Sequence, residues 1–288
     1  MALNLERMDA PLGAEIHDID LSQPLDDATF AEVEDAFNTY SVLVFRDQDL
    51  TPEQQIAFSR RFGPLEVHVL SQYLHPDHPE ILVISNILKD GRNVGIPDAG
   101  RYWHTDLSYM EAPSRGSLLY AMEVPEKDGD VLGDTLFASA SAAYDALPDD
   151  MKRRIDGVDA LFSLSHRFSK LEADGTKHQK MTDEQTENTP EVLHKLVQTH
   201  PVTGRKILFV NEGHAARIPS LPEGESRALL DELCEFCHRP EFVYRHRWRA
   251  GDLVMWDNIP TQHLAINDYA LPLRRYMHRT TLQGAPMG

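Results

Sequence analysis

The sequence predicts a mainly β protein with added helices, arranged as a jelly-roll. Three observations lead to this class. Short apolar or alternating segments, bounded by turn residues, recur along the chain. Helical spacing is confined to a few segments, and the sequence has no internal repeat or low-complexity tract. Many short strands with a few interspersed helices are typical of jelly-rolls. Because 288 residues with 41% hydrophobic content can build one substantial core, we expect a single domain over residues 1–288.

Helices are expected where apolar residues recur every three or four positions. Thr51 is suited to be an N-cap, with Pro52 in the first turn and Gln54 as its capping-box partner. Pro148 and Pro240 would stop two other helices. The predicted helices cover residues 24–40, 51–61, 138–147 and 225–237.

Strands are expected where apolar residues form short runs or alternate with polar ones. A loop over residues 90–100, rich in Gly, Asp and Pro, would lead into the strand that contains His104. The polar segment 166–190 has little periodicity, and it is either a lid or insertion or a solvated surface loop. The predicted strands cover residues 42–45, 81–84, 103–109, 242–248, 253–256 and 274–282.

The composition restricts the partners of the protein. With 28 basic and 46 acidic residues the formal net charge is −18, so nucleic acid is not an expected partner. The first residues lack a signal peptide, and no apolar run is long enough to span a bilayer, so we expect no membrane partner. We therefore expect a cytoplasmic protein whose two cysteines are reduced.

A candidate metal site lies at Trp103-His104-Thr105-Asp106. In an extended strand the side chains of His104 and Asp106 point the same way, which presets two ligands on one face. The downstream His263 would complete two histidines and one carboxylate. This facial triad leaves open positions on a non-haem Fe(II) ion, where a cosubstrate and O2 can bind.

Other interpretations of these residues have to be weighed. His75-Pro76-Asp77 has the same spacing, but its proline-broken surroundings are typical of a surface turn. A lone His263 is more often a hydrogen-bonded structural histidine than a metal ligand. The strand-like neighbours Trp103, Leu107 and Tyr109 favour the pair His104 and Asp106 over the first of these alternatives.

Several motifs together resemble one known family, the taurine dioxygenase and 2,4-dichlorophenoxyacetate dioxygenase family of Fe(II)- and 2-oxoglutarate-dependent oxygenases. They occur in family order over nearly the whole chain. The matching elements are Gly13 to Ile16, Ser41 to Arg46, Gln54 to Pro64, Trp103 to Asp106, Gly133 to Phe137, Trp256 to Asn258, Gln262-His263 and Arg274 to Arg279.

The resemblance implies a double-stranded β-helix core with iron held by His104, Asp106 and His263. It also implies that 2-oxoglutarate chelates the iron and that its distal carboxylate meets Thr135 and an arginine of the last strand. Arg275 fits that role by alignment and by strand parity, with Arg274 as the alternative. A guanidinium binds a carboxylate through two parallel hydrogen bonds, which a lysine cannot do.

The substrate side is also implied by the resemblance. Arg279 would bind an anionic group of the substrate, and His68 matches a histidine that hydrogen-bonds the same group, the alternative being a polar surface histidine. Tyr102 and Ser108 flank the metal motif and are expected to line the pocket. The family's glycine-rich turn is altered here to Gly129-Asp130-Val131-Leu132, which leaves Thr135 intact.

The resemblance therefore implies a dioxygenase that hydroxylates a small organic anion with release of succinate and CO2. The first expectation is a sulfonate such as taurine or an alkyl sulfate, with a hydroxylated product that fragments. The alternative is the same chemistry on an aryloxyalkanoate or another carboxylate, and a remote alternative is a non-catalytic binding or sensor protein. Residues 262–269 favour the taurine side, and residues 242–258 favour the aryloxyacetate side. Relatives are commonly dimers or tetramers, so we expect a homo-oligomer.

The segment Cys234-Glu235-Phe236-Cys237-His238 formally matches a c-type haem attachment pattern or half of a zinc site. Haem attachment requires export, and the sequence has no second cysteine pair to close a zinc site. We therefore expect two small helix cysteines at these positions.

Overall fold

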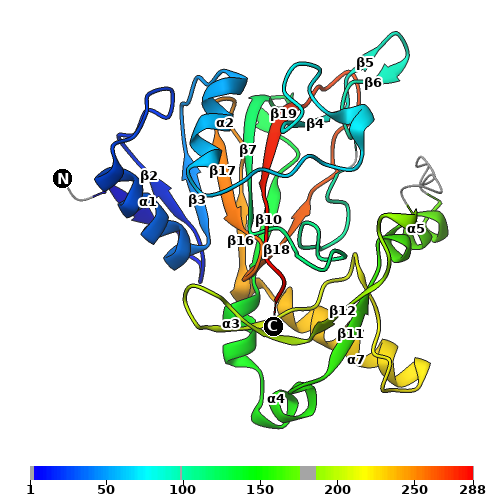
Figure 1. Ribbon diagram of the computed structural model, residues 1–288. Coiled ribbons are helices and arrows are strands. Elements are labelled where there is room, and N and C mark those ends of the chain that lie inside the picture. The colour runs from blue at the N-terminus through cyan, green and yellow to red at the C-terminus, as the bar shows by residue number, and fades with distance from the viewer. Residues whose placement is uncertain (1–2, 98, 176–185, 288) are drawn as a thin grey trace.

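The computed structural model describes residues 3–97, 99–175 and 186–287. Among these residues the largest sheet has seven strands, antiparallel except for the neighbours β2 and β3 (Figure 1). Across the sheet the order is β1 (Leu5–Arg7), β2 (Ala14–Ile16), β3 (Val42–Phe45), β17 (Leu253–Asp257), β7 (Gly116–Glu123), β19 (Tyr276–Leu282) and β4 (Leu82–Ser85).

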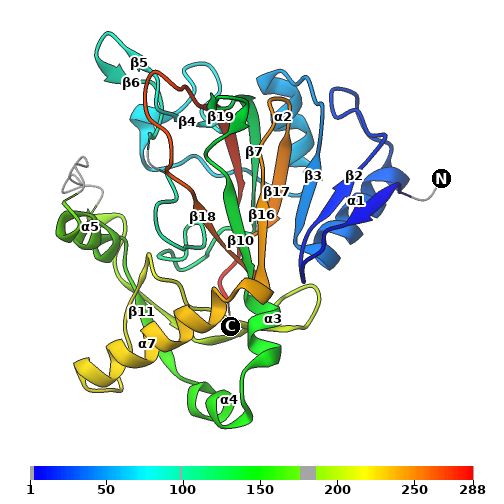
Figure 2. The same cartoon turned by 180° about the vertical axis from the view of Figure 1, so that it is seen from behind.

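A smaller antiparallel sheet packs against this large one, as Figures 1 and 2 show from opposite sides. Between the two sheets the ring of Phe137 lies 5.5 Å from that of Trp256. Two sheets packed around an apolar core confirm the predicted jelly-roll with a double-stranded β-helix core. The smaller sheet consists of β16 (Val243–His246), β10 (Thr135–Ser139) and β18 (Thr261–Ala265).

The central strands are apolar on both faces because both faces of the large sheet are covered. In β3, Val42 and Val44 pack into the core between the sheets, whereas Leu43 and Phe45 pack on the opposite face. That opposite face is covered by helices α1 (Asp27–Tyr40) and α2 (Pro52–Arg60) (Figure 1). This arrangement explains why such strands read as continuous apolar runs.

A third apolar cluster lies below the two sheets in Figure 1, where helices and short strands gather. Its elements are α3 (Ala140–Ala146), α4 (Asp149–Ile155), β11 (Asp159–Phe162), β12 (Val192–Lys195), β13 (Val197–Thr199), β14 (Lys206–Leu208), β15 (Ala215–Arg217) and α7 (Glu223–Cys237). The remaining elements are α5 (Leu164–Ala173), the hairpins β5 (Leu88–Lys89) with β6 (Arg92–Asn93) and β8 (Glu126–Lys127) with β9 (Asp130–Val131), and the 3₁₀ turns η1 (Ser71–Tyr73) and η2 (Pro240–Phe242).

The predicted helices form with small changes at their ends. Thr51 and Gln54 make the expected capping box at the start of α2, and Pro52 is its first residue. Helix α3 begins at Ala140 rather than at residue 138, because the preceding residues pair with two strands as part of β10. Ser139 caps α3 by accepting a hydrogen bond from the Ala142 amide at 3.2 Å. Among the described residues, no helix is long and apolar enough to cross a membrane.

Two predicted segments differ in the structure. The strand expected at residues 103–109 is wrong: His104 makes a single β-bridge, and the chain then turns, with Leu107 at φ +55°. The aperiodic segment expected from residue 166 is helical up to Ala173 in α5. Residues 176–185 of that proposed lid lie outside the described residues.

Candidate metal centre and active site

The two candidate histidine ligands come from distant segments that meet in one β-bridge. The amide of His104 donates to the carbonyl of His263 at 3.1 Å, and the amide of His263 donates to the carbonyl of His104 at 2.8 Å. His263 lies in β18, where it is paired with Phe137 of β10. The edge of the small sheet thus fixes the backbone of both histidines.

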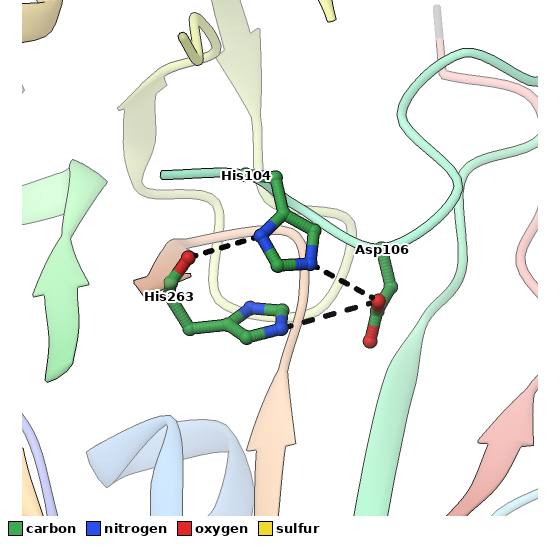
Figure 3. A group of neighbouring side chains, drawn as sticks. All are labelled: His104, Asp106 and His263. Atoms are coloured by element: carbon green, nitrogen blue, oxygen red, sulfur yellow. Dashed lines mark hydrogen bonds and ion pairs between the residues drawn. The ribbon is translucent and has the colours of Figure 1, made fainter. Parts of the chain in front are cut away.

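The turn after His104 brings Asp106 to the same place (Figure 3). The Oδ1 atom of Asp106 lies 3.6 Å from Nε2 of His104 and 3.9 Å from Nε2 of His263. All three donor atoms lie within 4.8 Å of one another. The side chains therefore converge as the sequence predicted, although a turn, and not strand alternation, aligns His104 with Asp106.

The hydrogen bonds of His104 and the neutral ring of His263 suit a metal. Nδ1 of His104 donates to the Tyr102 carbonyl at 2.9 Å, and the His263 carbonyl lies 3.1 Å from the same atom. The lone pair on Nε2 is therefore available to a metal ion. Burial and the neighbouring His104 hold the pKa of His263 well below its usual value, so its imidazole is neutral. Neutral imidazoles are the form that binds metal ions.

The carboxylate of Asp106 is ionised and held in place. Burial opposes ionisation, but Arg279 and the two histidines outweigh it and hold the pKa of Asp106 well below its usual value. Nη1 of Arg279 lies 2.8 Å from Oδ1, and the Ser117 hydroxyl donates to Oδ2 at 2.7 Å. Two imidazoles and one carboxylate fit a divalent iron site with open positions.

A side-chain network behind the carboxylate fixes its orientation. Nδ2 of Asn258 donates to the hydroxyls of Ser114 at 3.1 Å and Ser117 at 3.2 Å. The indole of Trp256 donates to Oδ1 of Asn258 at 2.9 Å. The Trp256 to Asn258 motif therefore connects strand β17 to the serine that holds Asp106. The sequence offered no signal for Ser117, because a serine in an apolar strand has no distinctive pattern.

The structure also brings Thr135 and Arg275 together. Nε1 of Trp248 donates to Oγ1 of Thr135 at 3.0 Å, and the guanidinium of Arg275 lies 5.5 Å from the Trp248 ring centre. Arg275 is buried, with 3% of its surface exposed. Its Nη1 donates to the carbonyl of Gly133, where a Cβ atom would lie 2.3 Å from Nη1, so only glycine fits.

Arg274 has the opposite environment. Its side chain is 52% exposed and lies 3.3 Å from Glu123 on the surface. Arg275 and Arg279 are both buried, and Met277 between them packs into the core between the two sheets. The ring centre of Tyr269 lies 5.8 Å from the Arg275 guanidinium. Neither Trp248 nor Tyr269 was singled out from the sequence.

Among the residues expected on the substrate side, His68 lies near the triad. Its Nδ1 accepts a hydrogen bond from the Leu70 amide at 3.1 Å, so the proton of the neutral ring is on Nε2. Burial, together with the nearby Arg279, lowers the pKa of His68 to about 3. His68 is half-buried, and its neutral ring can donate a hydrogen bond from Nε2.

Tyr102 and Ser108 make other contacts. The hydroxyl of Tyr102 donates to Asp174 at the end of α5, and the ammonium of Lys170 lies 4.8 Å from its ring centre. Ser108 is fully buried and bonded to Nδ1 of His214 at 2.9 Å. The structure therefore directs the Tyr102 hydroxyl towards α5, while the Tyr102 carbonyl lies 2.9 Å from Nδ1 of His104.

Sequence reasoning missed two residues near the triad. His214 lies between His104 and Tyr109, with ring centres 6.2 Å and 4.9 Å away. Arg167 of α5 acts electrostatically on His68, Tyr109 and His214. The helical period of α5 was the available signal, because Arg167 is three residues before Lys170 and shares its face.

Residues 4–281 match the model of the taurine catabolism dioxygenase TauD, TfdA family. The chain belongs to this family. It is 39% identical over 279 residues to the alpha-ketoglutarate-dependent 2,4-dichlorophenoxyacetate dioxygenase of Cupriavidus pinatubonensis, covering 93% of each chain. It is 32% identical to an alkylsulfatase of Acinetobacter baylyi, covering 98% of this chain and 85% of the relative.

The fold is similar to the crystal structure of AAD-2 in complex with Mn(II) and N-oxalylglycine. The TM-score is 0.85 at 35% identity, and the match covers 100% of this chain and 99% of the other. N-oxalylglycine is 2-oxoglutarate with an N–H group in place of one methylene. The chain is therefore a 2-oxoglutarate-dependent dioxygenase that uses Fe(II), 2-oxoglutarate and O2. The remote alternative of a non-catalytic protein is wrong.

Proposed function

We propose that this dioxygenase hydroxylates a small organic monoanion, with an aryloxyalkanoate as the first candidate. The observation that carries the proposal is the pair Arg279 and His68 beside the triad. Arg279 is 8% exposed, and among the described residues its Nε has no hydrogen-bond partner. A buried donor of this kind is costly unless a ligand accepts from it. An anionic substrate group would satisfy it.

We assign the metal to the converging atoms of the triad. Nε2 of His104, a carboxylate oxygen of Asp106 and Nε2 of His263 would hold Fe(II). When bound, the iron supplies the activation of O2 by which 2-oxoglutarate is converted to succinate and CO2 and a substrate C–H group is hydroxylated. The Ser117 hydroxyl keeps the carboxylate oriented towards the imidazoles.

We assign the distal carboxylate of 2-oxoglutarate to Arg275 and Thr135. The Arg275 guanidinium would make two parallel charge-assisted hydrogen bonds, and the Thr135 hydroxyl would add a third. The ring of Trp248 supports both side chains, since it donates to Thr135 and underlies Arg275. Burial lowers the pKa of Arg275, which makes a bound carboxylate favourable.

The substrate anion would then be held by one cation and one neutral donor. Arg279 supplies the charge, and Nε2–H of His68 supplies a hydrogen bond without a second charge. This combination suits a carboxylate, a sulfonate or a sulfate ester equally well. The local field of the arginines also opposes the net charge of −18, which would otherwise repel anions.

Similarity to relatives favours the aryloxyalkanoate. The chain is more similar to the 2,4-dichlorophenoxyacetate dioxygenase than to the alkylsulfatase, at 39% against 32% identity. Hydroxylation of the carbon between the ether oxygen and the carboxylate gives a hemiacetal, which breaks down to a phenol and an oxo acid. A sulfonate such as taurine or an alkyl sulfate is the second candidate, supported by the alkylsulfatase relative.

The test is succinate release from 2-oxoglutarate in the presence of Fe(II), ascorbate and air. The compounds are aryloxyalkanoates, alkyl sulfates and sulfonates, each with a control lacking substrate and with Asp106→Ala as the inactive variant. We expect aryloxyalkanoates to stimulate release and to yield a phenol. Stimulation by sulfates or sulfonates alone would replace the first candidate by the second, and stimulation by none of the three classes would contradict the proposal.

A further inference from the structure

The C-terminal end of α7 makes contacts that neither a haem nor a zinc interpretation explains. His238 directly follows the helix, and its ring stacks on that of Trp103, with centres 4.4 Å apart and an interplanar angle of 11°. Nε2 of His238 lies 2.9 Å from Oε1 of Gln262. The same Gln262 donates from its amide nitrogen to Sγ of Cys237 at 3.1 Å.

The two residues that α7 contacts have special positions in the chain. Trp103 immediately precedes His104, and Gln262 immediately precedes His263. In extended chain, neighbouring side chains point to opposite faces. Gln262 and His263 are neighbours in β18, so the Gln262 side chain extends behind the β-bridge that joins the two histidines, while the His263 imidazole extends in front of it. The side chains of Trp103 and Gln262 meet at His238.

We propose that His238 and Cys237 are positioning residues for the iron site, which hold the bridge between His104 and His263 from behind. The proposal rests on the assignment of these two histidines as metal ligands under the proposed function. It gives the Cys-x-x-Cys-His segment a role in which no metal binds to the segment itself.

The chemistry of the contact is that of neutral groups. Burial lowers the pKa of His238, so a neutral ring donates from Nε2 to the glutamine oxygen. Burial raises the pKa of the Cys237 thiol to about 12, so the sulfur accepts as a thiol. Gln262 is 1% exposed and satisfied at both ends of its amide by these two residues. The link is thus rigid and independent of charge near neutral pH.

The effect to be expected is a loss of metal affinity. Removal of a direct hydrogen-bond partner of a metal-binding histidine costs about 10- to 100-fold in affinity. His238 acts one residue further away, so His238→Ala should weaken Co²⁺ binding by about 10-fold, the lower end of that range. His238→Phe keeps the stacking on Trp103 and should recover part of this loss.

The experiment is a titration of the metal-free protein with Co²⁺ in competition with a chelating dye, together with the ligand-field absorption spectrum of the bound Co²⁺. The cysteines give a matched pair. Cys234 is a buried thiol one turn earlier in the same helix, so Cys234→Ala should leave affinity and spectrum unchanged, whereas Cys237→Ala should weaken binding. His17→Ala, at a remote histidine beside Glu6, is the control for His238→Ala.

The outcomes separate the possible failures. Equal affinity and equal spectra for the natural protein, His238→Ala and Cys237→Ala would overturn the proposal while leaving the metal site intact. Equal Co²⁺ binding by His104→Ala and the natural protein would overturn the ligand assignment and the proposal with it. If His238→Ala does not fold, His238→Phe and the two cysteine variants decide the question in the same way.

Discussion

Arg274 and Arg275 are neighbours in sequence with opposite environments, and they give a matched test of the cosubstrate site. Arg275→Ala should weaken 2-oxoglutarate binding by about 100-fold or more, since two charge-assisted hydrogen bonds are lost at about 1.5 kcal/mol or more each. Arg274→Ala removes only an exposed ion pair with Glu123 and should change binding less than about threefold. The measurement is the dissociation constant of 2-oxoglutarate, and the opposite order would show that Arg274 binds it.

Asp106 and Arg279 form a buried ion pair whose removal can be separated from metal loss. In the presence of a chelator, Asp106→Asn should destabilise the fold by about 3 kcal/mol, because Arg279 stays buried without its counter-charge. Arg279→Met should destabilise by a similar amount, and the double variant by less than the sum. The measurement is the free energy of unfolding in urea. If the loss of stability in the double variant equals the sum of the two single losses, Asp106 and Arg279 are not coupled.

At the level of single residues, the candidate ligands were predictable but their supports were not. His104, Asp106 and His263 have the residue types and motif context of a metal site. Ser117, Trp248 and His238 are held to the site by contacts with residues far away in the chain. No local pattern of sequence encodes such contacts, so only the folded structure reveals them.

Helix α5 is an element that sequence reasoning missed, and it packs near the candidate site. It contacts Tyr102, two residues before His104, through Lys170 and through Asp174, which follows the last residue of the helix. Arg167 acts on His68 and Tyr109 from the same helix. Polar residues dominate its sequence, and this concealed its helical period.

The position of Arg167 predicts a contribution to anion binding. Arg167→Gln should raise the KM for an anionic substrate severalfold at low salt, and less at high salt, because partly exposed charges are screened. Lys170→Gln, on the same face, is the control because its charge is already paired with Glu212 at 2.9 Å. If both variants raise the KM equally, the change results from the net charge of the helix and not from the position of Arg167.

Strands with apolar residues on both faces were predicted correctly. A turn whose residues alternate as in a strand was predicted wrongly. Strands β3 and β17 have apolar residues on both faces, and they form as expected. Trp103, Leu107 and Tyr109 alternate as in a strand, but Leu107 takes a positive φ of 55° that turns the chain. Positive φ is uncommon for leucine, so its sequence context gives no warning of this turn.

For the whole molecule, buried neutral histidines predict a loss of stability in mild acid. Burial lowers the pKa of His278 to about 4, with His75 and His78 nearby, and His278 is 3% exposed. Between about pH 6.5 and 4 the unfolded chain therefore binds a proton here that the folded chain does not. Stability should fall as the pH falls through this window, by about 1.4 kcal/mol per pH unit for each such group, and should not change on this account above pH 6.5.

The measurement is the free energy of unfolding in urea at several pH values between about 7.5 and 4.5. His278→Asn removes the titrating group. The slope of the free energy of unfolding against pH should therefore decrease by about 1.4 kcal/mol per pH unit in this window. An identical slope for this variant and the natural protein would show that His278 is already charged in the folded state.

The β-bridge between His104 and His263 joins residues that are 159 positions apart. In an unfolded chain, bringing these two imidazoles together would carry the full entropy of closing a long loop. The metal site therefore cannot precede the rest of the fold and forms only when the two halves of the chain have met. Any ion held there acts as a reversible cross-link across the molecule, and its binding free energy adds to the cooperativity of folding.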